Sequence, residues 1–274
     1  MEQMDDTPSI SSALPDTQNL TDHRRIPIRK VGVRSIEVPI KLDLPSDFQP
    51  NSIANLGLAV SLDAAQKGTH MSRFVEAIES VGEAWNPMCL RPVVENLAGR
   101  LQADLYFIDF ECPVFLIKQA PVSGKSGPMK YLIRASGALS EAGYRQEVSL
   151  KAWVTTLCPC SKAISNYSAH NQRGEITLSF DVPDDSEGVD LRRLISDLES
   201  AASSPLFSLL KRVDEKAVTE LAYDNPVFVE DLVRNVASVV RENHKLSQFT
   251  VEAENYESIH LHNAYAMLSS EDLV

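Results

Sequence analysis

The chain has 274 residues, 43% of them hydrophobic, and a formal net charge of −12 at pH 7. The apolar content suffices for a buried core, and the charge argues against a general nucleic-acid binder, because affinity for a phosphate backbone requires clustered Lys and Arg. No apolar run approaches the ~20 residues that span a bilayer, and the N-terminal segment lacks a signal-peptide profile. We therefore expect a cytoplasmic protein that binds neither nucleic acid nor membrane, with its four cysteines as free thiols or metal ligands.

The first half of the chain alternates between extended and helical patterns. Residues 1–26 are rich in Ser, Thr, Asp and Pro, and we expect them to form a flexible tail. Alternating apolar residues predict a strand over 31–40, with a change of parity that indicates a bulge, and a second strand over 56–62. Apolar residues at helical spacing then predict two short helices, one within 74–81 and one within 90–101.

Two further strands, within 104–118 and 131–135, complete a ββααββ module over 27–142. The second half repeats this order over 143–274. Its expected elements are strands within 148–154 and 176–182, a helix within 191–198, a long helix over 214–243 that Pro226 breaks or kinks, and closing strands within 249–253 and 259–261. The repeated order predicts an α+β fold made of two duplicated modules, each with an antiparallel sheet and a helix pair on one face.

The segment with the most chemical information is Cys158-Pro159-Cys160, at the end of a predicted strand, with His170 following. Pro159 ends regular strand pairing, so we expect both thiols in a loop. Thiolate and imidazole together suit zinc, and three protein ligands with one water make a catalytic site. On spacing alone, two buried thiols and an unrelated histidine are an equally good interpretation.

Acids and histidines gather in the second half of the chain. Glu215 lies at the start of the long predicted helix, Glu230 follows an Asn-Pro pair, and Glu257, His260 and His262 lie in the predicted closing strand. The two histidines share a parity and therefore a sheet face, while Glu257 has the opposite parity unless a bulge intervenes. For each acid taken alone, a solvated helix face is the simpler interpretation.

A basic turn, Lys67-Gly68-Thr69-His70-Met71-Ser72-Arg73, separates the second predicted strand from the first predicted helix. Free N–H groups at a helix N-terminus, together with Lys, His, Ser and Arg side chains, indicate a phosphate site, although an ordinary strand-to-helix turn is the alternative. The chain has no Walker-type glycine loop and no GxGxxG motif, which argues against P-loop or Rossmann nucleotide binding.

Four stretches together resemble one known family. They are KGTHMSRFVE (67–76), TTLCPCSKAIS with AHNQRGE (155–175), SSPLFSLLKRVDEKAVTELAYDNPVFVEDLVRN (203–235) and NYESIHLHNAYA (255–266). They are similar to GTP cyclohydrolase IB, a prokaryotic folate-pathway family. The resemblance implies the tunnelling fold, in which the sheets of ββααββ modules join around a barrel, and a homo-oligomer, a homotetramer being favoured, with active sites at subunit interfaces. It also implies hydrolysis of GTP to formate and 7,8-dihydroneopterin triphosphate, the first step of tetrahydrofolate biosynthesis.

The resemblance assigns roles residue by residue. Cys158, His170 and Glu215 look like ligands of a divalent metal, zinc in the first place and manganese or iron as alternatives. The metal would lower the pKa of a bound water, which then attacks C8 of guanine. Cys160 looks placed for a second role near the metal, in proton transfer or alternative ligation.

The remaining assigned roles concern the substrate. His260 looks like the general acid/base, supported by Glu257 or His262. Glu230 looks like the purine anchor, because one carboxylate can accept both N1–H and N2–H₂ of guanine, a pairing that adenine cannot reproduce. The side chains expected to bind the triphosphate are those of Lys67, His70, Ser72 and Arg73.

Other functions remain open at this point. An archaeal-type cyclohydrolase of the same fold would yield a cyclic phosphate product. A nitrile reductase of this fold is less consistent, because its Glu-Ser-Lys-Ser type of motif is missing. A zinc-stabilised binding module without turnover is the alternative from another class, but a closed structural site would have more Cys or His in place of the acids.

Overall fold

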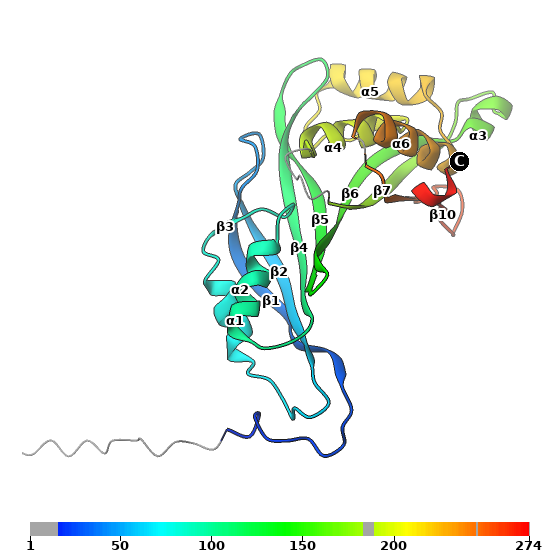
Figure 1. The fold of residues 1–274 in the computed structure, drawn as a ribbon. Coiled ribbons are helices and arrows are strands. Elements are labelled where there is room, and N and C mark those ends of the chain that lie inside the picture. Colours follow the sequence, from blue (N-terminus) through cyan, green and yellow to red (C-terminus); the bar gives the residue numbers. More distant parts are fainter. Residues whose placement is uncertain (1–15, 183–188, 245, 274) are drawn as a thin grey trace, which may run out of the picture.

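The computed structural model describes residues 16–182, 189–244 and 246–273. In these residues, ten strands form one sheet, and the longer helices pack on one face of it (Figure 1). The strands are β1 (Ile28–Leu42), β2 (Asn51–Leu62), β3 (Ala84–Trp85), β4 (Tyr106–Gln119), β5 (Ser126–Ser140), β6 (Gly143–Leu157), β7 (Asn171–Asp181), β8 (Ser204–Pro205), β9 (Phe249–Asn255) and β10 (Ala264–Ser269). The helices are α1 (Ser72–Glu79), α2 (Arg91–Arg100), α3 (Pro159–Ile164), α4 (Leu191–Ser200), α5 (Arg212–Asp224), α6 (Val229–Asn243) and the 3-10 turn η2 (Ser270–Asp272).

The strand order is β10-β9-β7-β6-β5-β4-β2-β1-β3, and the short β8 also pairs with β6. All the long strands pair antiparallel. The register of β1 on β2 shifts between Val33 and Ile36, which confirms the predicted bulge. The hairpin of β5 and β6 turns at Gly143, whose φ of 108° favours glycine, and this hairpin joins the two halves into one sheet.

Each long strand alternates between a buried and a polar face, as period-2 patterning requires. On β2, for example, Leu56, Leu58 and Val60 are buried beneath the helices. The opposite parity lines a concavity of about 530 Å³ on the sheet face away from the helices, with Arg34, Asp109 and other polar residues of six strands. The sheet therefore has its core on the helix-covered side only.

The observed order of elements confirms two ββααββ modules. The short elements α3, β3 and β8 and one further helix are additions to the predicted order. The predicted helix over 214–243 is two helices, α5 and α6, and Pro226 lies in the break between them. None of the described helices is both long enough and apolar enough to cross a membrane.

The predicted strand over 259–261 is wrong. β9 ends at Asn255 and β10 begins at Ala264, and these two residues pair with each other. Residues 256–263 are the loop that connects the two strands, so their alternation reflects no sheet face. Ile259 is 62% exposed and Leu261 is fully exposed.

Of the predicted tail 1–26, residues 1–15 lie outside the described residues. Residues 16–22 lie along the loop 65–70. Asp22 N–H donates to the Ala65 carbonyl, and Lys67 N–H and Gly68 N–H donate to carbonyls of the N-terminal segment. The basic turn is therefore covered on one side by the chain's own N-terminal segment.

Candidate metal centre

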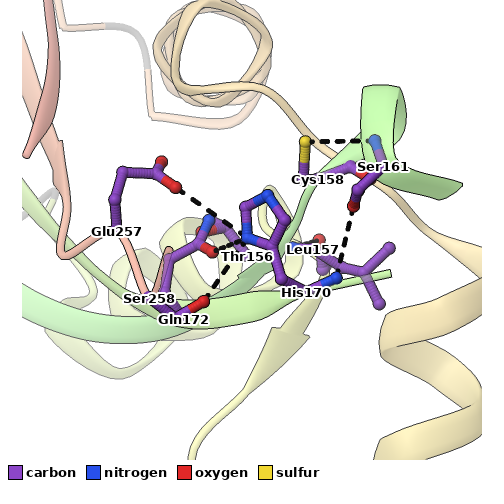
Figure 2. Close-up of polar contacts among 9 residues, drawn as sticks. Thr156, Leu157, Cys158, Ser161, His170, Gln172, Glu257 and Ser258 are labelled. Carbon is purple, nitrogen blue, oxygen red and sulfur yellow. Dashed lines mark hydrogen bonds and ion pairs between the residues drawn. The ribbon is translucent and has the colours of Figure 1, made fainter. Parts of the chain in front are cut away.

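Cys158 is held where β6 passes into α3 (Figure 2). It is the N-cap residue of α3, and its sulfur accepts a hydrogen bond from Ser161 N–H at 3.4 Å. Pro159 occupies the first turn, where its missing N–H removes no helix hydrogen bond. The sequence folds here into a strand end and a helix cap, so the thiol of Cys158 has a defined position.

His170 is fixed beside Cys158 by the backbone. Cys158 N–H donates to the His170 carbonyl at 3.1 Å, and His170 N–H donates to the hydroxyl of Ser161 at 3.2 Å. These contacts close the loop between β6 and β7. Two of the three predicted metal ligands therefore lie at the same end of the same strand pair.

Three oxygen atoms surround Nδ1 of the His170 ring (Figure 2). Oε1 of Gln172 lies 3.0 Å away, Oγ of Ser258 3.4 Å and Oε2 of Glu257 3.9 Å. The amide of Gln172 also donates to the hydroxyl of Thr156 at 3.0 Å. All these ring contacts involve Nδ1, so Nε2 is the nitrogen that they leave open toward a ligand.

The end of β6 is supported from behind by two segments of the second module. Leu157 N–H donates to the hydroxyl of the buried Ser203, and the Leu157 carbonyl accepts from Val227 N–H, both at 3.0 Å. Val227 lies two residues before the start of α6, and the exposed Glu230 lies in the first turn of that helix. The predicted purine anchor is thus brought to the same end of the sheet as Cys158.

The loop 256–263 is fastened to β7 at its start. Tyr256 N–H donates to the Arg173 carbonyl at 2.9 Å. Glu257 follows and points toward His170, whereas His260 and His262 are exposed farther along the loop. Their rings stack, with centroids 5.0 Å apart. The structure therefore places Glu257 against the ring of His170 and the two histidines outside it.

Cys160 lies in the first turn of α3 and is exposed. Because residues two positions apart on a helix do not face each other, its side chain diverges from that of Cys158. The sequence predicts both thiols in a loop, but they lie at the start of a helix. Of the two cysteines, only Cys158 lies next to His170.

Glu215 lies apart from this site in the single chain. Asp214 beside it is buried, and its carboxylate accepts from Val122 N–H and from Ser123 N–H and hydroxyl, in the hairpin between β4 and β5. The other end of α5 contacts α3, where Lys162 donates to the Tyr223 carbonyl. Eight residues of helix rise, ~12 Å, separate Glu215 from Tyr223. Within the described ranges, no three His, Cys, Asp or Glu side chains lie close enough to hold a metal ion.

The environment of Asp214 has an electrostatic signature. Burial raises the pKa of its carboxyl, but hydrogen bonds from Ser123, Lys211 and Val122 outweigh burial and hold the pKa well below its usual range. This ionised carboxylate joins the hairpin tip to the start of α5 and so fixes the helix that carries Glu215.

The predicted phosphate turn lies on the other half of the molecule. It precedes α1, which packs on α2 over the first module, whereas α3 lies at the far end of the second (Figure 1). Lys67 and Ser72 are exposed. Arg73 donates to the Arg100 carbonyl at 2.7 Å and so caps α2, and His70 lies 3.4 Å from the Asp16 carboxylate. One chain does not bring this turn to Cys158.

Sequence reasoning missed the residues that support the site. Gln172 and Thr156 are buried polar residues in the β6–β7 ladder, and Ser203 is buried behind Leu157. A signal existed for Gln172, because it shares its parity with the buried Ile176 and Leu178 of β7. An amide on the buried parity of a strand requires a polar partner.

The donors at this site fit a zinc-type metal in part. A thiol and an imidazole nitrogen are the ligands that zinc prefers, and both lie at the end of β6. A third ligand does not join them within the described part of one chain. The donor set therefore fits a metal ion whose remaining ligand comes from outside this part of the chain.

Comparisons with known proteins agree with these features. The family model described as type I GTP cyclohydrolase folE2 matches residues 14–266. GTP cyclohydrolase FolE2 of Ralstonia nicotianae is 43% identical over 258 residues, which cover 94% of this chain and 95% of the relative. GTP cyclohydrolase FolE2 of Akkermansia muciniphila is 45% identical over 262 residues, covering 94% and 98%.

Among solved structures, a uricase from Bacillus fastidious aligns with a TM-score of 0.50 at 12% identity, over 90% of this chain and 95% of that chain. This likeness concerns the fold alone and confirms the predicted tunnelling fold. The extent and identity of the sequence matches settle the family: the chain belongs to the type I GTP cyclohydrolase FolE2 family.

Proposed function

We propose that this chain hydrolyses GTP to formate and 7,8-dihydroneopterin triphosphate, as a GTP cyclohydrolase of the IB type at the first step of tetrahydrofolate biosynthesis. Family membership supports the substrate and the reaction. The observation that carries the proposal is the pairing of Cys158 and His170 by backbone hydrogen bonds at the end of β6. That pairing presents a thiol and an imidazole toward one site, next to the helix that carries Glu230.

Cys158 and His170 would hold a divalent metal through Sγ and Nε2, zinc in the first place and manganese or iron as alternatives. When bound, the metal supplies Lewis acidity and lowers the pKa of water at the site. Cys158 is pre-positioned by its cap on α3, and His170 by its contacts with Gln172 and Glu257. Both ligands are therefore ordered before a metal arrives, which reduces the entropy cost of binding it.

Glu230 would orient the substrate. Its carboxylate, in the first turn of α6, can accept N1–H and N2–H₂ of guanine together, and this bidentate contact selects guanine over adenine. The end of β6 and the start of α6 are joined through Val227 and Leu157, so the purine ring would be held next to the Cys158–His170 pair. Such positioning supplies a large part of the rate by lowering the entropy cost of reaction.

Proton transfers at the purine ring would fall to the loop 256–263. His260 is exposed on this loop and can act as the general acid/base, with His262 stacked against it. Glu257 contacts His170 and supports the site from the same loop. Cys160, exposed on α3, is available for a second proton-transfer role.

A neighbouring copy of the chain would complete the site, in a homo-oligomer for which we propose four subunits. Glu215 lies at the end of α5 away from α3, so the third metal ligand would come from a second subunit. The triphosphate would likewise be bound by Lys67, His70 and Ser72 of another copy, since α1 lies on the other half of the molecule. Arg73 would have to release the Arg100 carbonyl to take part.

The test is to incubate GTP with protein loaded in turn with zinc, manganese and iron. We expect formate in equal amount to GTP consumed, and a product that fluoresces as a neopterin after oxidation and retains its triphosphate. A cyclic phosphate in the product would instead identify the archaeal-type reaction. Loss of folding on chelation, with no formate from any metal, would identify a zinc-stabilised binding module.

A further inference from the structure

We propose that Gln172 is a positioning residue that sets the tautomer of His170, and that Thr156 fixes the orientation of Gln172. This inference rests on the proposed function, because it concerns the nitrogen that His170 offers to the metal. It concerns no group that touches substrate. Nothing in the resemblance or in the family comparisons assigns a role to either residue.

The three residues form a chain of contacts from the core to the surface. Thr156 on β6 and Gln172 on β7 are direct partners across the strand pair, and both are buried. The Gln172 amide N–H donates to Thr156 Oγ1 at 3.0 Å, which turns its carbonyl oxygen toward His170 Nδ1, also at 3.0 Å. The amide is thus held at both ends (Figure 2).

The chemistry of these groups determines which ring nitrogen carries the proton. A carbonyl oxygen can only accept a hydrogen bond, so Nδ1 must be the donor. The carboxylate of Glu257, 3.9 Å from the same nitrogen, is also an acceptor and independently favours a proton there. Neutral His170 therefore keeps its lone pair on Nε2, the form that a metal ligand needs.

The position of Gln172 argues against simple packing. It shares its parity with Ile176 and Leu178, which are buried apolar residues of the same strand. A buried amide costs free energy unless its polar groups are satisfied, and this amide is satisfied by Thr156 and by His170 itself. An apolar residue would fill the same space but would leave Nδ1 without this partner.

The main test compares Gln172→Met with Gln172→Glu. Methionine keeps the length and removes the acceptor, whereas glutamate keeps an acceptor oxygen. We expect Gln172→Met to bind zinc about 10- to 100-fold more weakly in competition with a chromophoric chelator, and Gln172→Glu to stay near the parent affinity. The cobalt-substituted Gln172→Met protein should also show a shifted visible spectrum.

Gln146→Met is the matched control. Gln146 is also a buried amide on β6, and it accepts from Leu90 N–H and donates to the Pro87 carbonyl at the end of the strand away from Cys158. Its substitution should lower stability and leave zinc affinity unchanged. If Gln172→Met fails to fold, Thr156→Val replaces it, because valine keeps the shape of threonine and removes the group that orients the amide.

The tautomer itself gives a readout that needs no metal. In the metal-free parent, ¹⁵N NMR should show His170 with its proton on Nδ1, and Gln172→Met should show a mixture. An Nε2–H parent, or a folded Gln172→Met protein with unchanged zinc affinity, would overturn the inference. A parent that has the Nδ1–H tautomer and binds zinc but releases no formate from GTP would instead overturn the proposed function and leave this inference standing.

Discussion

Lys118 offers the sharpest test of the packing between the two modules. It lies on β4, and its ammonium group is 2.6 Å from the carboxylate of Glu199 on α4 and donates to the Leu206 carbonyl at 2.8 Å. Tyr131 on β5 donates to the other oxygen of Glu199 at 2.7 Å. The Lys118 and Glu199 side chains are only 14% and 7% exposed, so each charge depends on the other.

Lys118→Met should lower the free energy of unfolding by about 3–4 kcal/mol at pH 7. Removing one partner of a buried ion pair typically costs about 3–5 kcal/mol, because the other charge is left buried and uncompensated. Protonating an ordinary glutamate at pH 7 costs about 4 kcal/mol, which sets an upper limit on the loss.

Urea unfolding at fixed protein concentration measures this effect, since the stability of the proposed oligomer would depend on concentration. The double variant Lys118→Met with Glu199→Gln removes both charges and keeps an acceptor for Tyr131, so it should recover at least about half of the loss. A Lys118→Met protein that loses less than about 1 kcal/mol at pH 7 would refute the reasoning.

Three further predictions concern the site and its supports. Cys158→Ala should lose both bound metal and formate release while remaining folded; metal analysis and circular dichroism check this, and full metal content would contradict the ligand assignment. Glu230→Ala should keep its metal and bind GTP about 100-fold more weakly, the loss expected for two hydrogen bonds to a charged group. Calorimetric titration measures the affinity for GTP, and an unchanged affinity would contradict the assignment of Glu230 as the purine anchor. Asp214→Asn should be less stable than the parent at neutral pH. Because folding lowers the pKa of Asp214, its carboxylate contributes fully to the free energy of unfolding above the ordinary aspartate pKa of about 4, and this contribution declines as pH falls below that value. The urea midpoints of parent and variant should therefore converge toward about pH 2. A difference between the midpoints that stays constant with pH would contradict this linkage.

Much of the fold could be predicted because the strands alternate cleanly. Leu56, Leu58 and Val60 on β2 and Ile176, Leu178 and Phe180 on β7 alternate as buried apolar residues, and the break at Pro226 follows from the missing N–H of proline. The failure at 259–261 has a physical reason. The alternating apolar residues there, Ile259 and Leu261, are exposed in the single chain. Neither hydrophobic periodicity nor strand propensity distinguishes such a loop from an edge strand.

The site could be predicted only where ligand chemistry is local in sequence. Cys158 and His170 are twelve residues apart and close a connection between neighbouring strands, so their proximity follows from the β6–β7 pairing. The separation of Glu215 from them depends on the direction of α5, which is set by the buried contacts of Asp214 with the β4–β5 hairpin. Such long-range contacts leave no pattern in the local sequence. The N-terminal segment 16–22 covers the turn 65–70 largely through backbone hydrogen bonds, which likewise leave no pattern in the sequence.

The most direct measurement of the central claim is formate release from GTP by a mixed oligomer. Cys158→Ala and Glu215→Ala would each be inactive alone. Co-expressed, they should recover about a quarter of the parent rate, because one site in roughly four then receives an intact Cys158 from one subunit and an intact Glu215 from its neighbour. A mixture as inactive as either variant, beside an active parent, would contradict a site shared between subunits; a parent that releases no formate would contradict the proposed reaction itself.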